Sequence, residues 1–204
     1  KVLGKGWWGT TRRARHVLDG KLYAVKTVRR SFREHERVLR QELTSLAKLP
    51  THYNVCHYHT STLIDDKLHI VLEYVDGLEF HKIVPKPHGH YHQKHPAEHV
   101  LAWMRQLFDG LAAMHNVNMV HRDLHMGNLL IAKDSQGRPA THSRAVKIID
   151  FGFAKVMELS RPQNVSMSGG SFRYFSPERR KRRISNDRDD VWTVGCILTE
   201  LASG

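Results

Sequence analysis

The sequence contains little cysteine and no long apolar segment. Only Cys56 and Cys196 are present among 204 residues, and they lie far apart in the chain. Two such cysteines can form neither a disulfide framework nor a four-cysteine zinc site, so a reducing compartment is expected. No segment approaches about 18 consecutive apolar residues, and the first residues lack the apolar stretch of a secretory signal. We therefore expect a cytoplasmic protein without a membrane partner.

Acidic residues are also scarce. The chain has 20 Asp and Glu against 32 Lys and Arg, which gives a formal net charge of +12. This excess favours anionic partners, among which nucleotides, acidic peptides and nucleic acids all fit. The hydrophobic content of 40% is enough for a sizeable core. It excludes disorder throughout the chain and predicts one compact domain or one domain of two lobes.

Five consecutive basic residues at 179–183 form the densest positive stretch. Such runs are usually solvated, so a solvated loop is the favoured interpretation; selection of acidic protein substrates and nuclear import are the alternatives. No aromatic residues alternate with these cations and no nucleic-acid-binding motif is present, so a nucleic acid is not the expected partner. The sequence leaves the oligomeric state open.

Hydrophobic periodicity predicts strands with one helix in the first third of the chain, and mixed helices and short strands after it. Residues 22–28 alternate as a strand, and 31–49 carry leucines at helical spacing before Pro50. The other expected elements are a strand over 68–75, a helix over 96–115, a hairpin of strands over 128–132 and 146–151, and a helix over 190–201. This pattern indicates an α+β protein with two lobes, residues 1–75 and 76–204.

A glycine-rich turn lies near the start of the chain, with the sequence Gly4-Lys5-Gly6-Trp7-Trp8-Gly9. Missing side chains let backbone N–H groups approach phosphate oxygens closely. By itself the motif also fits a plain turn or a dinucleotide-binding loop. No helical pattern follows it directly, which disfavours the dinucleotide-binding interpretation.

A lysine occupies an apolar face of the strand predicted over 22–28. Alternation with a period of two places Lys26 on the same face as Ala24, where a cation needs an anionic partner. On the helix that follows, a rotation of about 100° per residue places Glu42 in the leucine stripe, while Glu36 and Glu34 lie away from its centre. The sequence therefore predicts a pair between Lys26 and Glu42. Taken singly, each charge also fits a solvated surface residue.

Two further segments carry acids beside apolar strands. Asp123 precedes Asn128 by five residues, so a carboxylate able to accept a hydroxyl proton comes close to an amide oxygen able to bind a metal. Asp150 ends an apolar strand and is followed by Phe151 and Gly152, and its carboxylate is the hard oxygen ligand that Mg²⁺ prefers. Singly, each acid also fits a turn residue that caps backbone N–H groups.

Together these motifs resemble those of the protein kinases. In chain order they are the glycine turn, Tyr23-Ala24-Val25-Lys26, His121-Arg122-Asp123 with Asn128, Asp150-Phe151-Gly152, Ser176-Pro177-Glu178 and Asp190-Val191-Trp192. The resemblance implies a two-lobed protein kinase-like fold, with a small β-rich N-lobe containing one key helix and a mainly helical C-lobe. Because the chain stops just after the helix expected over 190–201, the last helices of the C-lobe are expected to be absent.

The resemblance also implies ATP and Mg²⁺ as cofactors and a role for each site residue. Lys26 would bind the α- and β-phosphates, Glu42 would orient Lys26, and Asp123 would be the base. Asn128 and Asp150 would hold Mg²⁺. The residues implied to contact the nucleotide are Leu3, Gly4, Gly6, Gly9, Thr11, Ala24, Lys26, Leu72, Glu73, Val75, Glu79 and Leu130.

Within this set, Ala24 and Leu130 would sandwich the adenine, and Leu72 would guard the back of its pocket. The backbone from Glu73 to Val75 would hydrogen-bond the purine. Beyond the set, Asp190 is similar to the family's buried acid that braces the catalytic loop.

His125 departs from the family pattern. Most serine/threonine kinases carry a lysine two residues after the catalytic aspartate, and no Lys or Arg stands at 124–127 here. An unperturbed imidazole is mostly neutral at pH 7, so a catalytic His125 would donate a hydrogen bond without a full charge unless phosphates raise its pKa. The loop also resembles that of choline and aminoglycoside phosphotransferases. A small-molecule phosphotransferase and a pseudokinase scaffold are therefore the alternatives to a protein kinase.

The acceptor is expected to be a serine or threonine hydroxyl of a protein substrate. The segment 171–178 resembles the corresponding segment of serine/threonine kinases, with Ser171 in place of a threonine. In the family, an arginine such as Arg122 binds a phosphate on the activation segment, and Ser166 and Ser168 lie at suitable spacing. We expect phosphorylation of one of them to activate the protein; an unmodified loop is the alternative.

Two surface expectations complete the sequence-based picture. The histidines between 81 and 99 lie among prolines, which indicates an exposed loop and disfavours a metal site. Leu198 and Leu201 lie near the end of the chain, so we expect them to face water or another chain.

Overall fold

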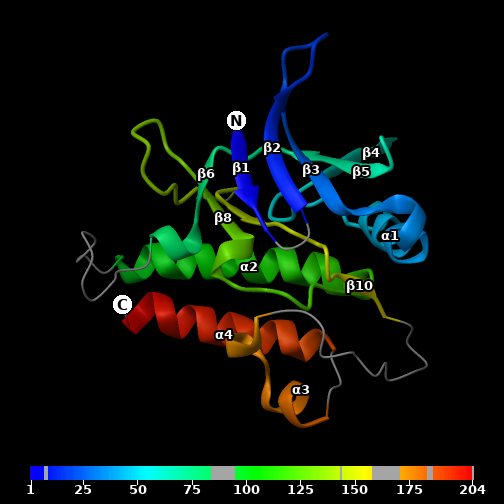
Figure 1. The fold of residues 1–204 in the computed structure, drawn as a ribbon. Helices are drawn as coiled ribbons and strands as arrows, with labels where there is room; N and C mark the ends of the chain where they lie inside the picture. The colour runs from blue at the N-terminus through cyan, green and yellow to red at the C-terminus, as the bar shows by residue number, and fades with distance from the viewer. Residues whose placement is uncertain (7–8, 84–94, 143, 158–170, 183–185, 204) are drawn as a thin grey trace.

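The computed structural model describes residues 1–6, 9–83, 95–142, 144–157, 171–182 and 186–203. An antiparallel sheet with a helix at its edge forms one part of the molecule, and two long helices beneath it form most of the other (Figure 1). This is the predicted α+β arrangement with a β-rich part and a mainly helical part. The boundary between lobes near residue 75 stays a prediction. The glycine-loop tryptophans, Ser166, Ser168 and Arg183 lie outside the described residues.

The sheet has five strands in the order β1-β2-β3-β5-β4, and every neighbouring pair is antiparallel. The strands are β1 (Val2–Lys5), β2 (Gly9–Arg15), β3 (Leu22–Ser31), β4 (Tyr58–Ile64) and β5 (Lys67–Glu73). A Cβ atom at Gly9 would lie 2.2 Å from the carbonyl oxygen of Thr27, so only glycine permits β2 to approach β3 this closely. In β3 the predicted alternation is confirmed, because Ala24, Lys26 and Val28 are all buried.

The helix α1 (Phe32–Ala47) follows β3 directly and lies inside the predicted range. The side chain of Ser31 caps it by accepting the N–H of Glu34 at 3.3 Å, which satisfies one of the free N–H groups of the first turn. Leu39 and Leu46 are buried on its inner face, as the leucine spacing predicts. Burial of this stripe fixes which helix face turns toward β3.

The second part is built around α2 (Ala97–Asn116), with α4 (Asp187–Ser203) packed along it (Figure 1). Three short strands form a sheet in the order β6-β8-β9, in which β8 and β9 are the predicted hairpin. The remaining elements are β6 (Gly77–Glu79), η1 (Phe80–Lys82), β7 (Met119–Val120), η2 (Met126–Asn128), β8 (Leu129–Ala132), β9 (Val146–Ile148), β10 (Lys155–Val156), η3 (Phe172–Tyr174) and α3 (Pro177–Arg182).

The two parts are joined through the segment before β4. The N–H of Cys56 donates to the carbonyl of Ile148 at 2.9 Å, and the N–H of Ile148 donates to the carbonyl of Asn54 at 2.8 Å. Gly110 of α2 sits against this joint, since a Cβ there would lie 3.0 Å from the Asn54 carbonyl oxygen. The interior glycine of α2 therefore permits close packing of the two parts.

Two expectations about the surface are wrong. Arg179, the first residue of the basic run, is 8% exposed in α3, so the run is not simply a solvated loop. Leu201 is 1% exposed, because it packs into the core with α2, whereas Leu198 is 38% exposed as expected. Within the described ranges, the structure holds no helix with the length and apolar character needed to span a bilayer.

Candidate active site

Lys26 and Asp150 meet at the centre of the site. The Nζ of Lys26 lies 2.7 Å from Oδ1 of Asp150, although 124 residues separate them in the chain. The Lys26 side chain is 10% exposed and that of Asp150 is 40% exposed, so part of the carboxylate is open to a ligand. Asp150 has a φ of 59°, a left-handed conformation that costs free energy in a non-glycine residue and is frequent at functional sites.

The ionisation of this pair follows from its surroundings. Burial lowers the pKa of Lys26, but the charges of Asp150 and Glu42 outweigh burial and raise it above its ordinary value. Burial raises the pKa of Asp150, but Lys26 outweighs it by charge and by hydrogen bonding, so that pKa is lowered. Both groups are therefore charged at neutral pH.

Glu42 approaches Lys26 without forming the predicted direct pair. Among the described residues, the ion pair of Lys26 is with Asp150, while Glu42 acts on the ammonium group through its charge at longer range. A Cβ atom on Gly152 would lie 3.4 Å from Lys26 Nζ and 3.8 Å from Glu42 Oε1. Glycine at 152 thus leaves room for the three charged groups to converge. Burial raises the pKa of Glu42, and Lys26 opposes that effect.

Asp123 lies in the loop between β7 and η2. Its Oδ1 accepts the N–H of Ser171 at 3.0 Å, and its carbonyl accepts the Nδ2 of Asn128 at 2.8 Å. The carbonyl of Asn128 in turn accepts the N–H of Ile149 at 2.9 Å, directly before Asp150. These bonds bring the sequence-predicted residues Asp123, Asn128 and Asp150 to one place. Burial raises the pKa of the Asp123 carboxyl group, opposed by His125 and His121.

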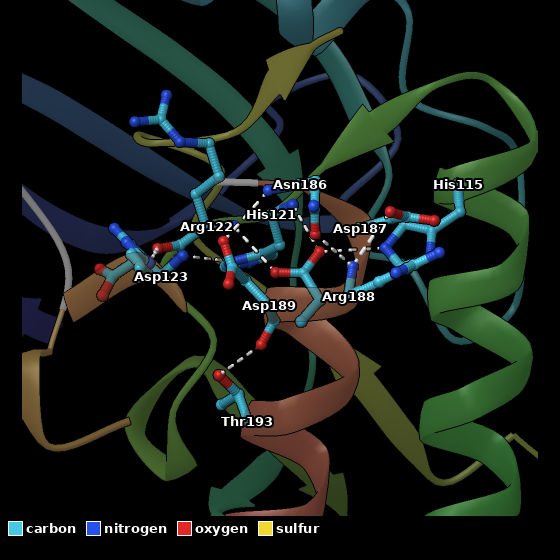
Figure 2. A network of polar contacts seen from close by, with 11 residues as sticks. His115, His121, Arg122, Asp123, Asn186, Asp187, Arg188, Asp189 and Thr193 are labelled. Carbon is cyan, nitrogen blue, oxygen red and sulfur yellow. Dashed lines mark hydrogen bonds and ion pairs between the residues drawn. The ribbon is translucent and has the colours of Figure 1, made fainter. Parts of the chain in front are cut away.

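The loop that carries Asp123 is held by Asp190 at the start of α4. Asp190 is 1% exposed and accepts the backbone N–H of His121 at 2.8 Å and that of Arg122 at 3.0 Å. It also contacts Nε2 of His115 at 3.0 Å. Figure 2 shows His121 and Arg122 beside the first turn of α4, with His115 reaching in from the neighbouring helix. The predicted brace is confirmed, and His115 is a partner that sequence reasoning missed.

Arg179 supports the same loop from α3. Its guanidinium donates to the carbonyl of Arg122 at 2.8 Å and lies 3.8 Å from the ring centroid of Phe175. Its backbone N–H donates to the Ser176 hydroxyl, which itself donates to the buried carboxylate of Asp189. Part of the basic run therefore contributes to the site. No local pattern in the sequence separates Arg179 from its solvated neighbours, because its partners lie far away in the chain.

His125 is held in one orientation beside Asp123. Its Nδ1 accepts the N–H of Gly127 at 3.0 Å, so the proton of the neutral ring lies on Nε2. That Nε2 lies 3.9 Å from Oδ2 of Asp123, and the ring stacks on Tyr174 with centroids 6.4 Å apart. Burial lowers the pKa of His125, although the charge of Asp123 opposes it. His125 is accordingly a neutral donor at pH 7.

The residues expected to contact a nucleotide lie on facing strand positions. Thr11 pairs with Lys26 across β2 and β3, and Ala24 pairs with Leu72 across β3 and β5. In the other sheet, Glu79 of β6 pairs with Leu130 of β8. Leu3 and Gly4 lie on β1, Gly6 lies in the glycine turn and Gly9 begins β2. Glu73 ends β5, and Val75 follows it by two residues. Their roles in nucleotide binding stay predictions.

The residues predicted to hold Mg²⁺ fit a hard cation. The Nδ2 of Asn128 is committed to the Asp123 carbonyl, which leaves its amide oxygen as the atom able to bind a metal. Asp150 adds a partly open carboxylate. Elsewhere in the described part of the chain, no cluster of three or more His, Cys, Asp or Glu side chains is arranged to hold a metal. The histidines at 84–94 lie outside the described residues.

Comparison with known proteins identifies the family. The protein kinase domain family matches residues 1–204, the whole chain. The chain belongs to the protein kinase domain family. Its catalytic-loop brace, its buried lysine and its Asp150-Phe151-Gly152 segment are thus parts of a kinase domain.

Similar curated proteins cover the whole of this kinase domain. They include mitogen-activated protein kinase kinase kinase YODA of Arabidopsis thaliana (32% identical, 100% of this chain, 22% of the relative), serine/threonine-protein kinase Nek4 of Mus musculus (28%, 100%, 24%) and mitogen-activated protein kinase kinase SIPKK of Nicotiana tabacum (31%, 100%, 53%). The kinase domain therefore spans only 22% and 24% of the length of the first two relatives.

Proposed function

We propose that this kinase domain is an enzyme that transfers the γ-phosphate of ATP to serine or threonine hydroxyls of protein substrates, with Mg²⁺ as cofactor. The observation that carries the proposal is the convergence of Lys26, Asp150, Asp123 and Asn128 through the contacts at 2.7 and 2.8 Å. A buried ammonium, two oxygen donors for a metal and a proton-accepting acid are the groups that phosphoryl transfer needs in one place.

The role proposed for each residue follows from its charge. Lys26 binds phosphate oxygens, and Glu42 and Asp150 keep it protonated. Asp123 accepts the proton of the substrate hydroxyl through the carboxylate oxygen that does not accept the Ser171 N–H. The Nε2–H group of His125 donates a hydrogen bond to the transferred group without adding a positive charge. The raised pKa of Asp123 makes it a stronger base than an exposed carboxylate.

Asn128 and Asp150 are the residues that would hold Mg²⁺, which when bound shields the charge of the phosphates. The adenine would lie between Ala24 and Leu130, with Leu72 behind it and the backbone from Glu73 to Val75 along its edge. The pairing of Ala24 with Leu72 supports this placement. We also propose residues 1–75 and 76–204 as the two lobes on either side of the nucleotide.

Protein serine and threonine residues are favoured as acceptors by the relatives and by the residues around Asp123. By name, Nek4 is a serine/threonine-protein kinase, YODA is a mitogen-activated protein kinase kinase kinase and SIPKK is a mitogen-activated protein kinase kinase. Ser171, in the segment that resembles serine/threonine kinases, binds Asp123 directly. The net charge of +12 favours acidic substrates. A cytoplasmic location, with nuclear entry as an alternative, follows from the paucity of cysteine and the basic run.

Regulation through Arg122 is part of the proposal. Its Nε is buried without a hydrogen-bond partner among the described residues. Burial and the charge of Arg179 lower the pKa of Arg122, although Asp190 and Asp189 oppose them. A guanidinium N–H without an acceptor is suited to bind an added anion. A phosphate on Ser166 or Ser168 would supply it, and equal activity of a double alanine variant at 166 and 168 would contradict this.

Transfer of labelled phosphate from [γ-³²P]ATP tests the function. The wild-type domain should label generic acidic proteins on serine or threonine, and Asp123→Asn should lose about 10²-fold or more of this activity because the base is gone. Labelling of choline or an aminoglycoside but of no protein would favour the small-molecule phosphotransferase. Nucleotide binding without any transfer would favour the pseudokinase scaffold.

A further inference from the structure

An ion pair joins the large sheet to the small sheet. The Nζ of Lys147, on β9, lies 2.7 Å from Oε2 of Glu73, the last residue of β5. The two residues are 74 positions apart in the chain. Their side chains are 13% and 30% exposed, so water screens the pair only in part.

Glu73 is fixed by several further contacts. Its Oε2 accepts the N–H of His57 at 3.1 Å, and its own N–H donates to the His57 carbonyl at 2.9 Å. Its carbonyl accepts the thiol of Cys56 at 3.7 Å. Burial raises the pKa of Cys56 to about 12, so this thiol keeps its proton and remains a donor. Both the side chain and the backbone of Glu73 are thus held, by Lys147 and by the segment 56–57.

Each partner leads to a different end of the proposed nucleotide site. Glu73 begins the segment 73–75, whose backbone would contact the purine, whereas Lys147 lies three residues before Asp150, which would serve the phosphates and metal. We propose that the ion pair between Glu73 and Lys147 is a positioning pair that fixes the purine-binding segment relative to the strand leading to Asp150. The inference rests on the proposed function and adds Lys147 as a residue that sets nucleotide affinity.

The neighbouring pair between Lys133 and Asp76 is a matched control. It joins a lysine directly after β8 to an acid three residues after β5, but its atoms are 3.8 Å apart and its side chains are 35% and 75% exposed. Exposed pairs of this kind contribute little to stability or binding. Lys133→Met therefore makes the same chemical change as Lys147→Met without removing a partly buried contact.

Adenosine and tripolyphosphate each carry only one end of ATP, so they separate an effect on purine binding from an effect on phosphate binding. For Lys147→Met we expect the KM for ATP and the Kd for adenosine to rise about five- to tenfold, which corresponds to the loss of one pairwise interaction free energy. The inhibition constant of tripolyphosphate, which lacks the purine, should stay within about twofold, and so should kcat. Lys133→Met should change none of these constants. Titration calorimetry with adenosine needs no turnover, so it reports on the pair even if phosphate transfer fails.

Three outcomes would overturn the positioning role. They are an unchanged adenosine Kd in Lys147→Met, equal weakening of adenosine and tripolyphosphate, and an equal effect of Lys133→Met. If Lys147→Met does not fold, the double variant Glu73→Gln with Lys147→Met avoids an unpaired carboxylate, and its adenosine Kd decides by the same criterion. A wild-type domain that binds adenosine but labels no substrate would contradict only the proposed transfer.

Discussion

The ammonium group of Lys26 and the carboxylate of Asp150 are in direct contact, 2.7 Å apart, although they come from the two different parts of the molecule. Lys26 is buried in the large sheet, and Asp150 follows the small sheet. This contact joins the two parts at the point where the proposed phosphate and metal groups lie. Each charge would be costly to bury alone, so the pair also explains why a lysine is tolerated on the apolar face of β3.

Lys26→Met should abolish most phosphate transfer. The change removes the cation for the phosphates and leaves Asp150 without its partner, so kcat/KM for ATP should fall on the order of 10²- to 10³-fold. Lys21→Met, at a lysine whose side chain is 73% exposed, is the control and should keep wild-type activity. Similar activity of the two variants would show that Lys26 has no catalytic part.

Glu42→Gln should reduce transfer by about tenfold, because one of the charges that keep Lys26 protonated and oriented is lost. Glu36→Gln changes an exposed glutamate of the same helix, whose ion pair among the described residues is with Arg40. Its kinetics should match those of the wild type. Steady-state rates at saturating ATP measure the activity of both variants. A larger loss in Glu36→Gln than in Glu42→Gln would contradict the role assigned to Glu42.

His125→Lys should raise turnover by about threefold to tenfold. The neutral imidazole donates only a hydrogen bond, whereas a lysine would bring a full charge to the transferred phosphate. His125→Ala should instead lower turnover, since the donor beside Asp123 is lost. Parallel measurements of kcat at pH 7 check both, and a fall in His125→Lys together with normal folding would mean that the ring itself is required.

The two cysteines should differ in reactivity. Burial raises the pKa of Cys56 to about 12, so its thiolate is scarce below that pH, and the residue is 3% exposed. Cys196 is less buried, although burial also raises its pKa. Iodoacetamide at pH 8 should therefore label Cys196 in the native protein and both cysteines after unfolding. Mass spectrometry of the peptides measures the labelling of each cysteine. Fast labelling of Cys56 in the native protein would contradict its burial beside Glu73.

Asp190→Asn should destabilise the domain by about 2–4 kcal/mol, because an amide can present only one oxygen to the N–H groups of His121 and Arg122 and leaves one unpaired. Asp187→Asn, at an exposed acid in the same first turn of α4, should change stability by less than about 0.5 kcal/mol. Urea unfolding compares the two. Equal midpoints would contradict the proposed brace.

Local sequence patterns were sufficient to predict the placement of several site residues. Alternation in β3 placed Lys26 beside Ala24, and helical phase placed Glu42 rather than Glu36 toward it. These predictions held because each depends on a period within one element. The order of the kinase motifs then indicated which loops would meet.

Contacts between distant segments could not be predicted in the same way. The direct partner of Lys26 is Asp150 and not the glutamate of the adjacent helix. The two residues are 124 positions apart, so no period within one element predicts that they meet. Arg179 is buried although its run appeared solvated in the sequence, and Glu73 meets Lys147 across 74 positions. Strand β4 was also missed, since its residues are mostly exposed and show no clear apolar alternation.

The position of a bound nucleotide tests the central claim most directly. A crystal structure with Mn²⁺ and a non-hydrolysable ATP analogue should show the α- and β-phosphates at Lys26 Nζ and the cation bound by the oxygens of Asp150 and Asn128, with the γ-phosphate facing Asp123. A triphosphate bound away from Lys26, or a cation that touches neither Asp150 nor Asn128, would contradict the account.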